Sequence, residues 1–263
     1  MARPVVALLT DFGTHDHYAG TMKGVILGIC PEATLVDISH DVTPHDLVGA
    51  SLELAASYRY FPAGTIFLVV VDPGVGSARR GLAAEAGDYR FVAPDNGVLT
   101  AALVDAKPKT LVELTERQYA RPTVSRTFEG RDRFAPAAGW LAKGVRLSAL
   151  GRPLADYQRL AIPAPEVTAG AIEGVVLRVD RFGNLITNID RKLFDRLAQE
   201  GAVEIAAGDT PIGRLVSTYS EIAGGEVAAL FGSSDRLEVA ANAASAAELL
   251  QLTQGARVAV RRA

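Results

Sequence analysis

The chain has 263 residues, of which 49% are hydrophobic and 22% are charged, and its formal net charge is −3. This composition is typical of a globular protein and argues against nucleic acid or an anionic membrane as a partner. Cys30 is the only cysteine, so no internal disulfide can form. The short apolar run in MARPVVALLTDFG lacks a signal-peptide pattern, and no segment reaches the ~20 apolar residues that span a membrane. These features predict a cytoplasmic location.

The first 160 residues alternate strand-like and helix-like segments. Helices are predicted at 18–29, where apolar residues recur with helical spacing, and at 46–60, where Asp46 is the expected N-cap. Continuously apolar strands in such an alternation predict an α/β domain with a mainly parallel sheet flanked by helices. The predicted strands are 4–10, 33–39, 65–71, 89–93 and 110–114.

The composition and the hydrophobic pattern of the sequence change near residue 161. Residues 161–171 are rich in proline and small side chains, which predicts a linker. Short strand-like pieces separated by turn residues fill 172–263, and they predict a smaller C-terminal β-barrel domain. One helix is expected near the end, in NAASAAELL.

Polar segments follow the predicted parallel strands: TDFGTHDHY, SHDVTPHD, DPGVGSARR and PDNG. Because parallel strands end at one edge of a sheet, these segments predict a ligand site there. The carboxylates in or beside them are Asp11, Asp16, Asp37, Asp41, Asp46, Asp72 and Asp95.

The glycine-rich segment DPGVGSARR does not fit a phosphate site. It lacks the Lys-Ser/Thr of a P-loop and the G-x-G-x-x-G of a dinucleotide site, and Asp72 would repel phosphate. A tight turn with no ligand is one interpretation. The alternative is that Asp72 and Arg79 pair across the turn and orient a water molecule. Asp11 is suited either to a ribose diol or to capping a turn.

The four histidines, His15, His17, His40 and His45, fall within the same polar segments. They leave a metal-dependent hydrolase open as an alternative, but no spacing matches a metal motif such as H-E-x-x-H, so we expect no metal.

Further candidates lie later in the chain. TFEGRD offers Phe128 and Glu129, although a well-capped surface helix is the favoured interpretation of this segment taken alone. In DRFGNLITNI, Phe182 can stack on a base and the Asn184 amide can both donate to and accept from an adenine edge. A simple hairpin turn is the alternative for that segment. Tyr219 is a further candidate for an aromatic side chain that lines the ligand site.

Seven segments together resemble one family over almost the whole chain: TDFGT, SHDVTP, FPAGTIFLVVVDPGVGSAR, PDNGVLT, TFEGRDRFAPAA, DRFGNLITNI and NAAS. It is the S-adenosyl-L-methionine (SAM) hydrolase (adenosine-forming) family, also called SAM hydroxide adenosyltransferases, which is similar to fluorinase and chlorinase. The resemblance implies cofactor-free hydrolysis of SAM to adenosine and L-methionine by displacement at the ribose 5′-carbon. It also implies a homotrimer, with sites between the N-terminal domain of one subunit and the C-terminal domain of its neighbour.

The resemblance also implies roles for individual residues. Asp72 and Arg79 match two members of a water-activating Asp-Arg-His triad, and Glu129 stands where the family has histidine. Asp11 would bind the ribose hydroxyls, Asp16 the methionine amine and Ser233 the methionine end. The adenine would be surrounded by Phe182, Asn184, Tyr219 and the backbone near Ala241, Asn242 and Ala243. Phe128, Asp180 and Glu238 complete the expected substrate-binding set.

Glu129 leaves two interpretations open. It can pair with Arg79, or it can itself take the proton from water as a general base. If it cannot replace the histidine, the chain is a non-catalytic SAM- or adenosine-binding protein. Halogenation is disfavoured, because Asp72 and Glu129 would repel a halide ion.

Overall fold

Strand β3 (Ile66–Val70) is buried along its whole length and lies inside a seven-stranded sheet. The computed structural model describes residues 3–263 and divides into two compact units, one ending at Ala161 and the other spanning Ile162–Ala263. The sheet belongs to the first unit. Its other strands are β1 (Val5–Thr10), β2 (Thr34–Ser39), β4 (Gly81–Ala86), β5 (Tyr89–Pro94), β6 (Pro108–Leu114) and β7 (Gly151–Pro153).

The strand order is β2–β1–β3–β5–β4–β6–β7. Strands β2, β1, β3 and β5 pair in parallel, whereas β4 pairs antiparallel with both β5 and β6. Strand β6 therefore runs in the same direction as β5, so five of the seven strands share one direction. The prediction of a mainly parallel sheet is confirmed.

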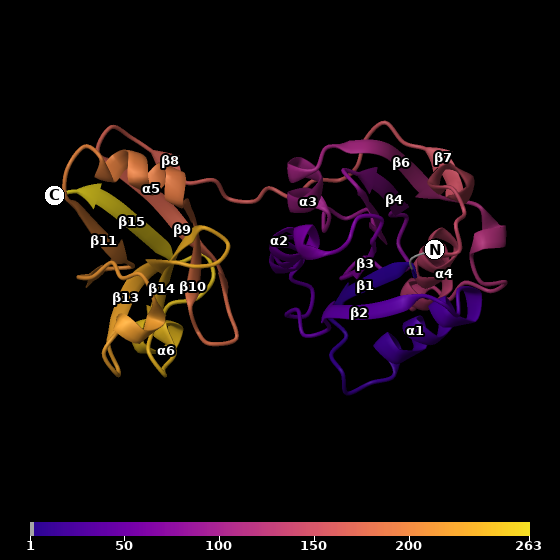
Figure 1. Ribbon diagram of the computed structural model, residues 1–263, viewed down its shortest axis with the longest axis horizontal. Coiled ribbons are helices and arrows are strands. Elements are labelled where there is room, and N and C mark those ends of the chain that lie inside the picture. Colours follow the sequence, from indigo (N-terminus) through magenta and orange to yellow (C-terminus); the bar gives the residue numbers. More distant parts are fainter. Residues whose placement is uncertain (1–2) are drawn as a thin grey trace. The chain divides into compact units, whose positions relative to one another are not determined.

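Helices cover both faces of this sheet (Figure 1). On one face, α1 (Tyr18–Ile29) and α4 (Ala135–Ala142) pack against alternate strand residues such as Leu68. On the other face, α2 (Leu47–Ser57) and α3 (Thr100–Asp105) pack against the intervening residues, including Phe67. This two-sided burial explains the continuously apolar strands.

Asp46 is the N-cap of α2, as predicted. The Gly49 backbone N–H donates to its Oδ1 at 2.8 Å. This bond satisfies one of the N–H groups that a helix start leaves without an intrahelical partner.

Strand β4 was not predicted, and it is the strand that shapes the site. Its sequence GLAAEA is rich in small residues with little strand preference, so only pairing with its neighbours specifies it. Because β4 runs antiparallel to β5, its first residue lies at the edge where β3 and β5 end. The chain just before it carries Arg79 and Arg80, which are thereby brought to that edge.

Short helices complete the first unit. The π-helical turn η3 (Gly130–Phe134) runs directly into α4. Single turns of 3₁₀-helix occur at η1 (Tyr58–Tyr60), η2 (Arg117–Tyr119) and η4 (Leu147–Leu150).

The second unit is an antiparallel sheet that curls into a barrel, as predicted. Its strands are β8 (Glu166–Val167), β9 (Ala171–Val179), β10 (Leu185–Asp190), β11 (Val203–Ala207), β12 (Thr210–Ile212), β13 (Val227–Phe231), β14 (Arg236–Ala241) and β15 (Arg257–Arg262). Strands β12 and β13 lie at the two ends of the strand order. The chain just after β12 closes the gap, because the Val216 N–H donates to the Ala229 carbonyl and the Ala229 N–H donates to the Arg214 carbonyl, each at 2.9 Å.

Three short helices belong to this unit: α5 (Arg191–Ala198), η5 (Tyr219–Glu221) and α6 (Ala246–Leu250). The helix predicted in NAASAAELL is α6, whose N-cap Ser245 accepts a hydrogen bond from the Glu248 N–H. Among the described residues 3–263, no helix is both long and apolar enough to cross a membrane.

Candidate active site

The ends of β1 and β3 bring two of the predicted carboxylates side by side. Thr10 pairs with Val70 in the parallel register, so Asp11 and Asp72 leave neighbouring strands within about one residue of each other. Asn96, just beyond β5, donates its Nδ2 to the Val71 carbonyl at 2.9 Å and links the end of β5 to the same place. The predicted edge therefore exists, and Asp11 and Asp72 are on it.

Asp95 also lies at this edge, but its carboxylate is already occupied. It is 4% exposed, it accepts from Arg80 Nε at 2.7 Å, and its second oxygen accepts from the Gln158 N–H at 2.8 Å. Asp95 therefore fixes the segment around residue 158 rather than offering a free group.

Asp11 is half-buried and held in place, whereas Asp16 is exposed. The His45 N–H donates to Asp11 Oδ2 at 2.9 Å. Asp16 lies in an exposed loop with 62% of its side chain accessible, and His15 Nδ1 lies 3.8 Å from its Oδ1.

A buried histidine braces the strand end that carries Asp11. His40 Nδ1 lies 2.8 Å from Thr10 Oγ1, and its Nε2 lies 3.0 Å from Asp37 Oδ1. Lys23 contacts the other Asp37 oxygen at 2.6 Å. Burial raises the pKa of the Asp37 carboxyl, but the bonds from Lys23 and His40 outweigh it and bring the pKa below its usual value. His40 is therefore a structural residue.

Arg79 and Asp72 form the centre of the site. Arg79 Nε donates to Asp72 Oδ1 at 2.8 Å, and its Nη2 donates to Asp72 Oδ2. Both side chains are over 90% buried. Burial lowers the pKa of the Arg79 guanidinium, but hydrogen bonding to Asp72 and the charges of Asp72 and Glu129 outweigh it, so its pKa is raised. The predicted pairing across the turn is observed.

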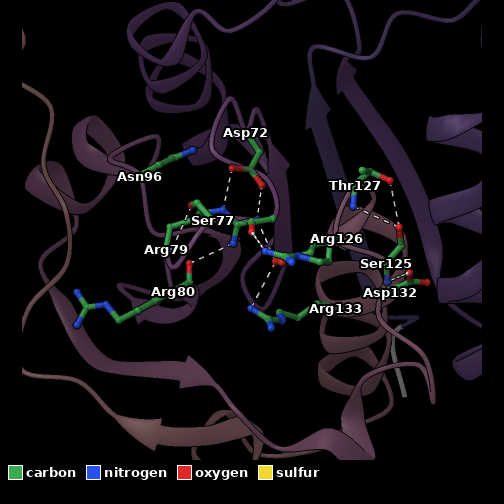
Figure 2. Close-up of polar contacts among 12 residues, drawn as sticks. Asp72, Ser77, Arg79, Arg80, Asn96, Ser125, Arg126, Thr127, Asp132 and Arg133 are labelled. Atoms are coloured by element: carbon green, nitrogen blue, oxygen red, sulfur yellow. Dashed lines mark hydrogen bonds and ion pairs between the residues drawn. The ribbon is translucent and has the colours of Figure 1, made fainter.

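Glu129 joins the same guanidinium from a segment fifty residues away. Arg79 Nη2 donates to Glu129 Oε2 at 2.9 Å, and Arg133 Nη1 lies 3.4 Å from that same oxygen. The ring of Phe134 lies under the Arg79 guanidinium at 5.1 Å. Figure 2 shows Asp72 and Arg133 in this cluster, with the Arg80 guanidinium directed away from it.

Only one of the two glycines in DPGVGSARR is required by the fold. Gly76 has φ +77°, and a Cβ there would lie 2.3 Å from the Arg126 carbonyl oxygen. Gly74 has no such conflict, because its nearest neighbour would be Ser77 Oγ at 3.5 Å. Gly76 thus lets the loop approach the backbone just before Glu129.

Glu129 lies directly before the π-helical turn η3, and Asp132 lies within that turn. Such turns occur often at functional sites. Asp132 is fully buried; it accepts from Arg131 Nε at 2.7 Å and Nη2 at 2.8 Å, and from the Ser125 N–H at 2.8 Å. Burial raises the pKa of its carboxyl, but these bonds outweigh it and hold the pKa below the usual value.

Phe128 is a core residue. It is 9% exposed and packs edge-on against Tyr18 at 5.1 Å and Phe12 at 6.0 Å between ring centroids. These rings connect the loop after β1 with the segment that carries Glu129.

In the second unit, Asp180 organises the turn between β9 and β10. Its Oδ1 accepts from the N–H groups of Phe182 and Asn184, and its Oδ2 accepts from Asn184 Nδ2, all at 2.9 Å. Phe182 is 76% exposed, whereas Asn184 is 4% exposed. The turn therefore presents an aromatic ring beside an amide whose orientation is fixed.

Tyr219 and Glu238 form a second pair in this unit. Tyr219 Oη donates to Glu238 Oε2 at 3.0 Å. Burial raises the pKa of the Glu238 carboxyl, and burial together with the Glu238 charge raises the pKa of Tyr219 to about 12. Gly232 makes room for this carboxylate, because a Cβ there would lie 1.8 Å from Glu238 Oε1.

The remaining candidates of the second unit lie on loops or strand ends. Ser233 is exposed, Ala241 ends β14, and Asn242 donates its Nδ2 to the Ile222 carbonyl at 2.9 Å. Ala243 has φ +53°, a left-handed conformation that is uncommon for a residue with a Cβ and that recurs at functional sites.

Arg133 and Phe134 are site residues that the sequence analysis missed. The four-residue spacing from Glu129 to Arg133 was a usable signal, because side chains at that spacing meet on a helical segment. Among residues 3–263, no three His, Cys, Asp or Glu side chains converge as metal ligands would.

Comparisons with known proteins agree over both units. The family model described as SAM hydroxide adenosyltransferase N-terminal domain matches residues 6–151, and its C-terminal counterpart matches residues 174–259. A protein of Thermus thermophilus named (R)-S-adenosyl-L-methionine hydrolase is 40% identical over 261 residues, covering 96% of this chain and 97% of its own.

Two further relatives extend the comparison. A fluorinase of Actinoplanes sp. is 30% identical over 298 residues, covering 99% of this chain and 98% of its own. The crystal structure of an uncharacterized conserved protein from Thermotoga maritima superimposes with a TM-score of 0.92 at 35% identity, covering 98% of this chain and all of that one.

The two loop glycines provide a matched pair of substitutions. Gly76→Ala is expected to lower the free energy of unfolding by about 2 kcal/mol or more, since alanine must adopt a positive φ and its Cβ meets the Arg126 carbonyl. Gly74→Ala is expected to change it by less than about 1 kcal/mol. Urea denaturation of both variants measures the difference, and equal effects would contradict the assigned role of Gly76.

Asp132 should make stability depend on acid pH. Because its folded-state pKa is lowered, its contribution is present above the unfolded value of about 3.9 and is lost as the pH falls through the folded value. The stability gap between wild type and Asp132→Asn should therefore be largest near neutral pH and shrink below about pH 4. Denaturation across pH measures it, with Asp16→Asn as the exposed control; a constant gap would contradict the prediction.

Proposed function

The chain belongs to the SAM hydroxide adenosyltransferase family, as its motifs predicted, and we infer from this membership that it hydrolyses SAM to adenosine and L-methionine. The family models match in both units, and the relatives named as SAM hydrolases align over nearly the full chain. The site agrees with this chemistry, because its buried carboxylates suit a neutral water nucleophile better than a halide.

The reaction needs alignment more than acid catalysis. SAM is a sulfonium, so its sulfur leaves as a neutral thioether without protonation. The water oxygen forms a bond to the ribose 5′-carbon, and the C5′–S bond breaks with its electron pair remaining on the sulfur of methionine. One proton of the water passes to a base, and adenosine keeps the new 5′-hydroxyl. The enzyme must hold the water in line with the C5′–S bond.

We assign the role of general base to Glu129, because one of its two carboxylate oxygens is free within the described part of the chain. Arg79 donates hydrogen bonds to both carboxylate oxygens of Asp72, and Arg79 and Arg133 both contact Oε2 of Glu129. Glu129 Oε1 has no partner among residues 3–263 and is therefore available to accept a proton. This observation carries the mechanistic proposal. Asp72 holds Arg79, and Arg79 orients both Glu129 and the water.

Substrate binding is assigned to residues of both units. In the first unit we propose that Asp11 accepts hydrogen bonds from the ribose hydroxyls, that Asp16 binds the methionine amine, and that Phe128 walls the ribose. In the second unit, Asp180 holds one N–H of the Asn184 amide, which leaves Oδ1 for the adenine amino group. The remaining proposed contacts are Phe182, Tyr219, Ser233, Glu238 and the backbone from Ala241 through Asn242 to Ala243.

We propose a homotrimer, in which the N-terminal unit of one subunit and the C-terminal unit of its neighbour complete each site. The division of labour supports this assembly: the water-activating groups lie in one unit and the adenine-reading groups in the other. We also retain the prediction of a cytoplasmic location, which the single cysteine, Cys30, and the sequence pattern of the first residues support.

Incubation of the purified protein with SAM tests the function. Adenosine and methionine should form in equal amounts, and activity should survive EDTA treatment. Tight SAM binding in calorimetry without products would instead identify a binding protein, and loss of activity on chelation would identify a metal-dependent hydrolase.

Variants of the two carboxylates test the mechanism. Asp72→Asn and Glu129→Gln should each lower kcat by about 10²-fold or more while SAM affinity stays within a few-fold, because both act on the nucleophile. Glu129→His should retain turnover, since histidine is also a general base. The exposed Glu116→Gln is the control. Full activity of Glu129→Gln at neutral pH would exclude Glu129 as the base.

Mixing two inactive variants tests the trimer. Asp72→Asn lacks an N-terminal group and Asn184→Ala lacks a C-terminal one, so co-refolded subunits should regain up to about a quarter of wild-type activity if neighbours share sites. Either variant refolded alone should stay inactive. Absence of any recovery in a verified mixed assembly would contradict shared sites.

A further inference from the structure

We propose that Arg133 is a positioning residue for the reaction, which helps to hold one carboxylate oxygen of Glu129 and leaves the other oxygen free. This inference rests on the proposed function, because it explains how a glutamate can serve as the base in this site. It concerns a residue of this chain that contacts neither water nor SAM in the mechanism above.

The charge balance of the cluster depends on Arg133. Asp72 and Glu129 share one guanidinium, and all three side chains are at most 9% exposed. Two carboxylates around a single guanidinium carry one formal negative charge more than that cation balances. Arg133 supplies a second positive charge, so the formal charges of the four side chains balance.

The geometry directs this charge to one oxygen. Arg133 Nη1 lies 3.4 Å from Glu129 Oε2, the same oxygen that accepts from Arg79 at 2.9 Å. Both cations therefore hold Oε2, and Oε1 stays without a partner among residues 3–263. Gly81 leaves room for this placement, because a Cβ at that position would lie 3.1 Å from Arg133 Cδ and 3.0 Å from the Phe134 ring.

A cavity lined by Arg133 makes the proposal accessible to experiment. The cavity has a volume of about 660 Å³ and lies among β6, η2 and α4. Arg133 lines it together with Leu114, Tyr119 and Ala137. Because Arg133 both lines this cavity and contacts Glu129 Oε2, its truncation is expected to leave space beside Glu129 for a small planar cation.

Chemical rescue is the decisive experiment. Arg133→Ala should lower kcat at neutral pH by about tenfold, with little change in the KM for SAM, because Glu129 loses one of its two cations. Millimolar guanidinium chloride should raise the kcat of Arg133→Ala several-fold, and sodium chloride at equal concentration should leave it unchanged. Arg117→Ala is the matched control. Arg117 lines the same cavity, and no hydrogen bond or ion pair of its side chain occurs among residues 3–263, so neither a loss of rate nor a rescue is expected.

The pH profile gives the second readout. The charged groups in contact with Glu129 are Arg79 and Arg133, with Asp72 bound to the same Arg79. In Arg133→Met, which keeps the apolar packing of the stem, the acidic limb of the kcat profile should move to higher pH, and Arg133→Lys should return it most of the way.

The outcomes separate the two proposals. A wild-type protein without turnover overturns both. An active wild type whose Arg133→Met and Arg133→Ala variants keep its rate and pH profile overturns only the role of Arg133. A rate loss that is equal at every pH and is not rescued by guanidinium would assign Arg133 a purely structural role, and it would also overturn the proposal.

Discussion

The candidate site of the first unit is organised around one buried ion pair, Asp72 with Arg79. A guanidinium that is more than 90% buried is tolerated only where hydrogen-bonding anions surround it, since a lone buried charge costs several kcal/mol. Asp72, just after β3, supplies one of these anions, and Glu129, from a segment far along the chain, supplies the other. The return of β4 to the same edge and the π-helical turn after Glu129 are the backbone features that bring these groups together.

The same requirement explains why the site suits water. A halide would have to approach two carboxylates, whereas a water molecule can accept from a cation and donate to an anion. Fluorinase-like relatives share the fold over the full chain, so the fold alone does not choose the nucleophile. We propose that the choice lies in a few side chains at the sheet edge, among them Glu129 with its two arginines.

Sequence patterns predicted the parts of this structure that depend on local signals. The apolar run at β3, the N-cap at Asp46 and the Asp72–Arg79 pair across a short turn are all readable within about ten residues. Strand β4 was missed because alanine and glycine carry no strand preference. The bonds from Asp180 to Asn184 and from Tyr219 to Glu238, and the second cation on Glu129, depend on side-chain placement that sequence alone does not specify.

The contact between Gly76 and Arg126 has a mechanical consequence. The glycine lies against the Arg126 carbonyl, and Arg126 Nη2 donates back to the Gly76 carbonyl at 3.3 Å. Two loops that are fifty residues apart in sequence therefore meet through a close backbone approach and a hydrogen bond. This contact joins the loop between Asp72 and Arg79 to the segment that leads into Glu129, so a substitution that displaces one loop is expected to displace the other.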